Sequence, residues 1–455
     1  MRLKTYRYPA QYIYTQIVNK AEHKLYNLKV NLQKKTNLSH LQMFFYSTFG
    51  AIAIGAFFTG FARKAGLSEV EIGIMSGLVG SCSLFSMFAS WLYESIKRVR
   101  LLYIVILMIY TLFFCTSTFL GYLTYSSQLN LKIAIIVFYY LFFLFYIFSL
   151  QIFLPWLNSI VSKDDWHSFF SNRQVIGSVA AFAANFLAGK YLGDNPGIIN
   201  FVIVFSIAAA FGIASGLSVI KLPEPEESEE KKFDIRNYLK NVKRCITGEK
   251  FYIVLTAQFF KSFAISMTAP FIIIFLLEEI QINYLQIATL INISLVVALI
   301  GYKLTGYLTK KFGNYSVYKY TLLAGLFLPV LFAVSTKDYY FIFYIIYFIT
   351  GFYESSWLLS GIGVTFDYAR LGKKSVYNSL SAMAGGLGAI GAPIIGGYLI
   401  RFFNSIEINA SIFGVPLTSY RILFLISIIF TGVSVVILFI NKPQYRSVGA
   451  GQPIR

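Results

Sequence analysis

The chain has 455 residues, of which 57% are hydrophobic and 13% are charged, and its mean hydropathy is +0.64. This composition excludes an ordinary soluble enzyme, a disordered protein and a small disulfide-stabilised protein. The formal net charge of +19 would suggest nucleic-acid binding in a soluble protein, so the positions of the basic residues decide its meaning. The composition predicts an all-α polytopic membrane protein.

Apolar runs long enough to cross a bilayer, which takes about 20 residues per helix, recur along the whole chain. In chain order they lie near residues 42–62, 72–93, 101–123, 131–154, 174–192, 198–220, 251–277, 286–309, 320–336, 339–363, 378–400 and 421–441. A polar stretch of mixed charge divides these twelve runs into six and six. We therefore expect the following order: a basic segment at 1–41 that forms an amphipathic helix, a six-helix bundle at 42–220, a cytoplasmic charged linker at 221–250, a second six-helix bundle at 251–441 and a cytoplasmic tail at 442–455.

The basic residues fall mainly on one side of the predicted membrane. With both termini in the cytoplasm, 30 of the 39 Lys and Arg residues lie in cytoplasmic segments, and the other 9 lie in outer segments or within spans, with Lys261 and Lys303 the ones well away from the span ends. This excess follows the positive-inside rule and predicts a multi-pass protein of the cytoplasmic membrane with both termini inside. Because topology accounts for the charge, no nucleic-acid partner is needed. The first apolar run continues as a full span, so we expect no cleaved signal peptide.

The two halves of the chain echo each other weakly. Segments 168–170 and 189–192 recur 207 residues later, at 375–377 and 396–399. A shorter echo follows the second and eighth spans, as Ser90-Trp91-Leu92 and Gly306-Tyr307-Leu308. The second of these loops continues with Lys310, Lys311, Phe312 and Gly313, and the first continues with Glu94, Lys97 and Arg98.

These loop residues, together with twelve spans around a polar linker, make residues 42–441 resemble the major facilitator superfamily of secondary transporters. The family's loop motif has an aspartate where this chain has Lys310, and Glu94 stands at the matching place in the first half. The resemblance implies that Glu94, followed by Arg98, forms part of an inner gate. Arg173, Asp367 and Arg370 are further candidates for gate ion pairs, although solvated loop charges explain them equally well.

Charged side chains inside spans cost about 2.5 to 3.5 kcal/mol at the bilayer centre, so their partners matter. Lys261 in the seventh span and Glu354 in the tenth each lie about ten residues, or roughly 15 Å, from the predicted inner end of their helix. The resemblance implies that the first, fourth, seventh and tenth helices line a central cavity. We therefore predict an ion pair between Lys261 and Glu354, which either couples transport to a proton or a cationic group at Glu354, or only secures helix packing.

Polar residues at helical spacing accompany both charges, with Gln258 beside Lys261 and Trp357 beside Glu354. On the fourth span, Gln151 and Asn158 are candidates for hydrogen bonds to a polar substrate, with helix packing as the alternative.

Two further features of the spans predict close helix packing. Asn185 in the fifth span and Asn292 in the eighth are expected to form hydrogen bonds between helices. The glycines of the eleventh span, between Gly385 and Gly397, predict helices that approach closely.

An enzyme is not expected, because the three histidines lie far apart in cytoplasmic segments and no spacing fits a metal site or a nucleophile with its base. We expect no cofactor and no metal. The sequence predicts a secondary active transporter that moves a small solute by alternating access, with proton-coupled import of a polar metabolite such as a sugar as the leading function. Proton-coupled efflux of amphiphilic compounds is the first alternative, and a transporter-like receptor or lipid-handling protein is the second. The expected partners are a small-molecule substrate, a coupling proton and membrane lipids, with the chain acting as a monomer.

Overall fold

The computed structural model describes residues 37–85, 98–127, 129–160, 166–224, 251–368, 374–406 and 410–441, with residues 88, 92, 96 and 408 described singly. The predicted amphipathic segment, most of the linker and the tail therefore lie outside the described residues. Residues 37–53 are helical. The further helices and strands are α2 (Ala56–Lys64), α3 (Glu69–Ser81), η1 (Cys82–Phe85), α5 (Val99–Ser127), α6 (Lys132–Ile160), α7 (Trp166–Leu192), α8 (Ile198–Ser218), α10 (Tyr252–Glu278), α11 (Tyr284–Phe312), α12 (Asn314–Ala324), α13 (Phe327–Val334), η2 (Lys337–Tyr339), α14 (Ile342–Tyr368), α15 (Lys374–Asn404), β1 (Ser411–Ile412), β2 (Val415–Pro416) and α16 (Ser419–Ile440).

Two of the predicted spans are interrupted in the structure. Gly55 separates the helical segment 37–53 from α2, and its φ of 87° lies in the left-handed region that favours glycine. The ninth span consists of α12 and α13, which meet at Gly325 and Leu326. Pro329 of α13 has no N–H with which to continue the helical bonding to Gly325, so the two short helices do not merge into one.

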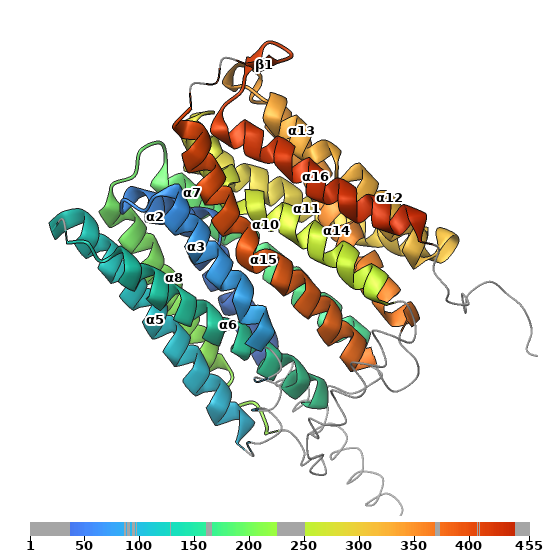
Figure 1. Cartoon of the computed structure of the whole chain (residues 1–455). Helices are drawn as coiled ribbons and strands as arrows, with labels where there is room; N and C mark the ends of the chain where they lie inside the picture. The colour runs from blue at the N-terminus through green and yellow to red at the C-terminus, as the bar shows by residue number, and fades with distance from the viewer. Residues whose placement is uncertain are drawn as a thin grey trace, which may run out of the picture.

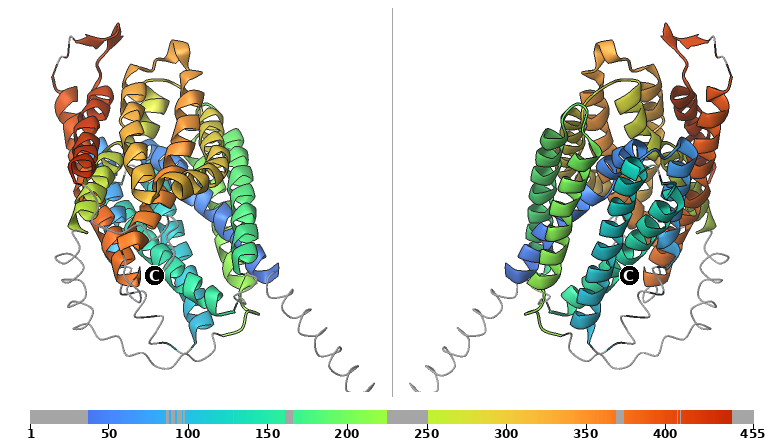
Figure 2. Two further views of the ribbon diagram at one scale, coloured as in Figure 1. Left: turned by 90° about the vertical axis from the view of Figure 1, so that its right-hand side faces the viewer. Right: turned by 90° about the vertical axis from the view of Figure 1, so that its left-hand side faces the viewer.

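The helices form two bundles, which lie beside each other in Figure 1. The first contains the helical segment 37–53 and α2 to α8, and the second contains α10 to α16. We call the end that carries β1 and β2 the hairpin end, and the opposite end, where Glu224 and Phe251 lie, the linker end. Figure 2 shows both bundles from two further sides, with the hairpin at the top of each view.

Helices α3 and α15 lie side by side across the boundary between the bundles. Their contact is close because glycines face the backbone of the opposite helix. A Cβ added to Gly80 would lie 2.8 Å from the carbonyl oxygen of Ala389, and one added to Gly397 would lie 2.6 Å from that of Glu69. The prediction that the glycines of this span allow close approach is confirmed. We call this contact the α3–α15 seam.

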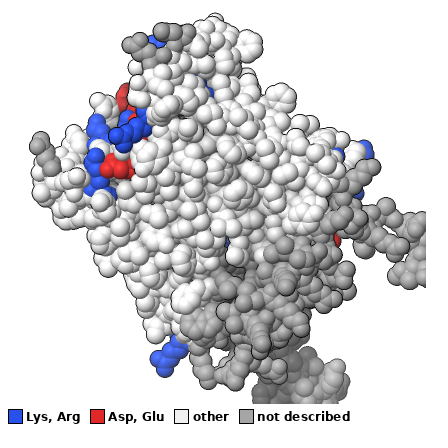
Figure 3. Space-filling model, in the orientation of Figure 1, with Lys and Arg blue, Asp and Glu red and all other residues white. Residues whose placement is uncertain are grey.

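Eleven helices of the described residues are long and apolar enough to cross a membrane. The remaining predicted span, the second at 72–93, begins with α3 and η1, and most of its last eight residues fall outside the described part of the chain. In Figure 3 the visible face is mostly uncharged, whereas basic and acidic surface gathers at the hairpin end. The predicted all-α polytopic membrane fold is confirmed.

Candidate functional site

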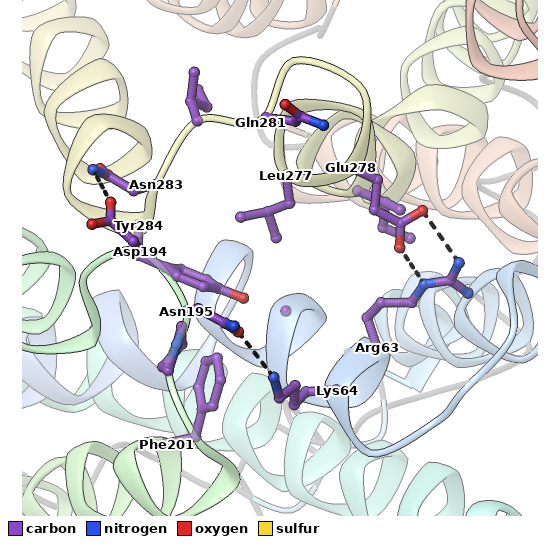
Figure 4. A pocket seen from close by; sticks show the side chains of 14 residues that line it. Arg63, Lys64, Asp194, Asn195, Phe201, Leu277, Glu278, Gln281, Asn283 and Tyr284 are labelled. Carbon is purple, nitrogen blue, oxygen red and sulfur yellow. Dashed lines mark hydrogen bonds and ion pairs between the residues drawn. The ribbon is translucent and has the colours of Figure 1, made fainter.

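At the hairpin end, an ion-pair cluster joins the two bundles (Figure 4). Arg63, in the last turn of α2, donates from Nε to Glu278 Oε1 at 2.6 Å and from Nη2 to Glu278 Oε2 at 3.2 Å. The same guanidinium lies 2.9 Å from Glu69 Oε1 of α3. A planar guanidinium can bind carboxylates through several N–H groups at once, so Arg63 links an acid of its own bundle to an acid at the end of α10.

Contacts between the loop after α7 and the start of α11 also join the two bundles at the hairpin end. Asn283 Nδ2 donates to Asp194 Oδ1 at 2.7 Å, and the Tyr284 N–H donates to the Gly193 carbonyl at 3.2 Å. The Tyr284 ring also reaches α2, where its Cε1 and Cζ would lie 2.9 Å from a Cβ added to Gly60. These residues surround a cavity of about 470 Å³ between the bundles, seen from close by in Figure 4.

Hydrogen bonds between α7 and α11 join the two bundles at positions farther from the hairpin end. Asn185 Nδ2 donates to Asn292 Oδ1 at 3.4 Å, and Asn292 Nδ2 donates to the Phe182 carbonyl at 3.1 Å. The predicted interhelical hydrogen bonds of both asparagines are confirmed. Asn185 lies seven residues, or about 10 Å, before the end of α7. The two bundles are therefore bonded together from the hairpin end as far as Asn185 and Phe182 of α7, and the described residues form no hydrogen bond between the bundles nearer the linker end.

Glu279, directly after Glu278, faces the buried Arg421 of α16. Arg421 Nε lies 3.5 Å from Glu279 Oε2, and Arg421 Nη2 donates to the Ser335 carbonyl at 2.9 Å. Burial raises the pKa of the Glu279 carboxyl, and a hydrogen bond from Thr418 and the charge of Arg421 offset only part of that effect. This pair connects the end of α10 to α16 at the hairpin end of the second bundle.

A second cavity, of about 530 Å³, lies within the second bundle. Its walls come from α10, α11, α14 and α16 and from both sides of the break between α12 and α13. The lining contains the two charged residues Lys261 and Glu354. It also contains aromatic rings and apolar side chains, among them Tyr302, Tyr353, Trp357, Ile265, Ile272, Leu328, Phe332 and Phe424. We call this space the second-bundle cavity.

Lys261 does not form the predicted ion pair with Glu354. Its side chain is buried, and Nζ lies 2.9 Å from the centroid of a Trp357 ring. Between the described side chains of Lys261 and Glu354 there is no ion pair or hydrogen bond, although their charges interact across the cavity. The ammonium is attracted to the face of the indole ring instead, which a sequence pattern does not anticipate.

Glu354 begins an exposed stripe along α14. Leu358, Ile362 and Phe366 follow at four-residue spacing, and they are 39%, 39% and 41% exposed. A carboxylate is costly to place against hydrocarbon, so we infer that this face of α14 adjoins the space into which the cavity opens. The helix continues to Tyr368 at the linker end, and the stripe therefore leads from the cavity toward that end.

The other predicted cavity residues take different positions. Gln258 lies one turn before Lys261 on α10, where its Oε1 accepts a hydrogen bond of 3.0 Å from the Tyr318 hydroxyl. Gln151 is exposed on α6 and lines neither of the two cavities described above. Asn158 belongs to α6, but its side chain lies outside the described part of the structure. Of the predicted residues, Lys261, Glu354 and Trp357 are thus the three that share one cavity.

Arg173 differs from its predicted place in a solvated loop. Helix α7 begins at Trp166, so Arg173 lies inside the helix and is buried. Its guanidinium donates to Ser39 Oγ at 2.8 Å and also to Gln42 Oε1. Both partners belong to the helical segment 37–53, so Arg173 joins helices within the first bundle and does not bridge to the second.

The remaining gate candidates form no described bond between the bundles. Asp367 Oδ2 accepts a hydrogen bond of 2.9 Å from Asn314 Nδ2, and both residues belong to the second bundle. Arg98 is exposed at the linker end. Glu94 and Arg370 lie outside the described residues, so their predicted gate roles stay predictions.

Sequence reasoning did not identify the hairpin-end cluster. Arg63 and Glu278 were separated by 215 positions, and each stood at the end of an apolar run. The available signal was that both halves carry basic and acidic residues on the predicted outer side, Arg63 in the first and Glu278 in the second among them, which allows pairing between the bundles.

Known proteins resemble the chain in sequence over one half and in fold throughout. The family model described as Major Facilitator Superfamily matches residues 254–453, and among curated proteins there is no significant match. A solved variant of the nucleoside transporter NupG superposes with a TM-score of 0.66 at 13% identity, covering 90% of this chain and 99% of the other. A bacterial homologue of the human lysosomal transporter Spinster, inward-facing and occupied, gives 0.66 at 13% identity, with 90% and 96% covered. An inward-facing bacterial homologue of the iron transporter ferroportin gives 0.62 at 14% identity, with 90% and 98% covered. The second bundle is thus similar in sequence to the major facilitator superfamily, and the fold of the chain is similar to the folds of these solved transporters.

Proposed function

We propose that the protein is a proton-coupled secondary transporter that imports a small polar solute by alternating access. The observation that carries this proposal is the second-bundle cavity, where Lys261 and Glu354 place two opposite charges within a membrane-spanning bundle. Charges at that depth are expensive and are retained mainly where they bind ions or solutes.

Glu354 is the proposed coupling group. Its carboxylate lines the cavity, is exposed, and has no hydrogen bond or ion pair among the described residues. A proton taken up there removes one negative charge from the cavity. Because the charges of Glu354 and Lys261 interact, the proton also changes the electrostatic environment of Lys261, where the solute would bind. Uptake and release of the proton and of the solute at this one cavity would then be linked to the change in relative orientation of the bundles.

The described conformation fits one of the two states of the proposed alternating-access cycle. The bonds of Arg63 and Asn283 close the hairpin end, and the hydrogen bonds between described residues of the two bundles do not extend to the linker end. The bias of basic residues supports a cytoplasmic position for the linker end. On this orientation the state is inward-facing, as in the two bacterial homologues described above. The opposite state requires the hairpin-end bonds to break.

The solutes of the structural relatives do not decide the solute of this chain. The relatives are described as nucleoside, lysosomal and iron transporters, and their identities of 13% and 14% support the fold alone. The choice of a small polar solute rests on the cavity itself, whose charged residues would have no purpose for a purely apolar compound.

Spin-label distances test the proposed cycle without knowledge of the solute. In the full chain, with Cys82, Cys115 and Cys245 replaced by serine, one label pair is placed at Asn195 and Gln281 of the hairpin end. A second pair is placed at Leu101 and Phe312 of the linker end. In proteoliposomes we expect two populations, with the two distances changing in opposite directions as the pH is lowered from 8 to 5.

The Glu354→Gln variant should lose the pH response of both label pairs while keeping both populations. Lys303→Gln, which removes an exposed charge from α11, is the matched control and should behave as the unsubstituted chain. A single fixed distance for each pair at every pH would refute alternating access. A full pH response in Glu354→Gln would refute the coupling role.

A further inference from the structure

We propose that the solute of the second-bundle cavity is a zwitterion of the amino-acid class with an apolar side chain, its carboxylate bound at Lys261 and its ammonium bound at Glu354. This inference rests on the proposed transport function and names its substrate class.

Lys261 provides the site for an anionic group. Its side chain is 5% exposed, and among the described residues its ammonium has the Trp357 ring as its neighbour and no carboxylate as a partner. An aromatic face attracts a cation but carries no net charge, so the positive charge of Lys261 is not neutralised by this contact. A carboxylate from the solute would supply the missing counter-charge through a charge-assisted hydrogen bond.

Glu354 provides the complementary site on the same wall. It precedes Trp357 by three positions on α14, so the two side chains share one face of the helix. Lys261 lies against that tryptophan, and the two charges therefore stand near each other without touching. A solute with only a negative charge would be repelled by Glu354, and one with only a positive charge would be repelled by Lys261. A zwitterion satisfies both centres and leaves the cavity electrically neutral.

Three serine and threonine hydroxyls of the cavity offer few hydrogen-bond donors to a sugar. Thr350, Ser427 and Thr431 donate to the carbonyls of Ile346, Phe424 and Ser427 at 2.8, 2.6 and 3.2 Å. Their protons are therefore engaged by their own helices. A polyol needs many donors and acceptors from its site, and these three hydroxyls offer it little more than their oxygen lone pairs.

The rest of the lining suits an apolar side chain. Ile265, Ile272, Leu328, Phe332 and Phe424 surround the two charged centres. The cavity volume of about 530 Å³ falls within the range of roughly 300 to 1,000 Å³ that is usual for small-molecule sites. Burial of an aliphatic or aromatic group against these residues would add to the two charge contacts.

Binding of matched probes to the purified full chain tests the proposal. The probes are radiolabelled L-leucine and L-phenylalanine, with L-phenylalanine methyl ester, N-acetyl-L-phenylalanine and D-glucose as unlabelled competitors. The ester keeps only the positive charge, and the N-acetyl compound keeps only the negative charge. We expect at least one of the two amino acids to bind, and the ester, the N-acetyl compound and glucose to compete at least about tenfold more weakly than the parent amino acid.

The variants should respond in a crossed pattern. Lys261→Gln and Glu354→Gln should each weaken amino-acid binding at least about tenfold. Lys261→Gln should reduce the difference in affinity between phenylalanine and its methyl ester. Glu354→Gln should reduce the difference in affinity between phenylalanine and its N-acetyl derivative. Lys303→Gln should leave the affinities unchanged. The crossed pattern is a readout that a loss of folding would not give, because misfolded protein would lose all probes alike.

Each contrary result has a defined meaning. Equal competition by the ester, by the N-acetyl compound or by glucose would overturn the zwitterion assignment, and so would the absence of binding by both amino acids at millimolar concentration. If the spin labels still report two exchanging states, only the solute class fails. If amino acids bind but the labels report one fixed state, the site stands and the transport cycle fails.

Discussion

Arg63 and Glu278 hold the two bundles together through a two-pronged contact, with the guanidinium Nε and Nη2 bonded to the two carboxylate oxygens at 2.6 and 3.2 Å. Their side chains are 32% and 40% exposed, so the pair lies where water and salt weaken it. A contact of this strength is suited to closing an interface that must also reopen.

Arg63→Glu should favour the state in which the hairpin end is open. Loss of an exposed ion pair of this kind changes the balance by about 1 kcal/mol, or roughly fivefold in the ratio of the two states. The label pair at Asn195 and Gln281 measures that ratio. The reversed pair, Arg63→Glu with Glu278→Arg, should restore much of the closed population. If the reversal restored nothing, the contact between these two residues would not be what closes the hairpin end.

Gly60→Ala should also weaken the closure, for a steric reason. The added methyl group would meet the ring of Tyr284, whose Cε1 and Cζ would lie at 2.9 Å. We expect greater thiol labelling of a cysteine placed at Gln281. Gly432→Ala on α16 is the control, because a Cβ there meets no atom within 4 Å. Tyr284→Phe, combined with Gly60→Ala, removes the hydroxyl and should recover part of the closure. Unchanged labelling in Gly60→Ala would contradict this account.

Lys261→Met should separate stability from transport. The substitution replaces a buried ammonium that has no carboxylate partner with an apolar chain of similar length, and so removes the cost of burying that charge. We expect the unfolding temperature to stay the same or rise, while proton-driven uptake is lost. Differential scanning fluorimetry and proteoliposome uptake measure the two effects. Lys303→Met, at an exposed position, should change neither. A less stable variant with normal uptake would show that Lys261 serves packing alone.

Glu279 predicts a pH dependence of stability at the hairpin end. Burial raises its pKa in the folded protein, so the folded chain binds this proton more tightly than the unfolded chain does. The stabilising contribution of the protonated group is therefore complete below the unfolded pKa and declines as the pH rises through the folded pKa. We expect Glu279→Gln to reduce the fall in unfolding temperature between pH 4 and pH 7. Asp338→Asn, at an exposed site of η2, is the matched control. A slope equal to that of the unsubstituted chain would contradict the prediction.

The sequence predicted the spans and the two bundles because span length and hydropathy are local properties of the chain. It also brought Lys261 and Glu354 to one cavity, since charges inside spans are few and cannot face lipid. Their pairing was predicted wrongly. Whether an ammonium meets a carboxylate or an indole ring depends on side-chain rotamers and on the rotation of each helix, which periodicity does not determine.

Two other differences have a related cause. Arg173 was assigned to a loop because hydropathy marks where a helix becomes apolar, and α7 begins eight residues before the predicted span. In the proposed transport cycle, the hairpin-end cluster depends on which of two conformations the chain adopts. A single sequence encodes both conformations, so it does not by itself say which set of charges is joined.

The α3–α15 seam has a consequence for leakage. Along this seam the glycines of one helix lie against the backbone of the other helix. Few long side chains interdigitate there to fix the angle between α3 and α15. One bundle could then roll against the other while this flank stays sealed to water and ions. A bulky residue at Gly77, which faces the Ile390 carbonyl, would thus be expected to create an uncoupled conductance as well as a slower transporter.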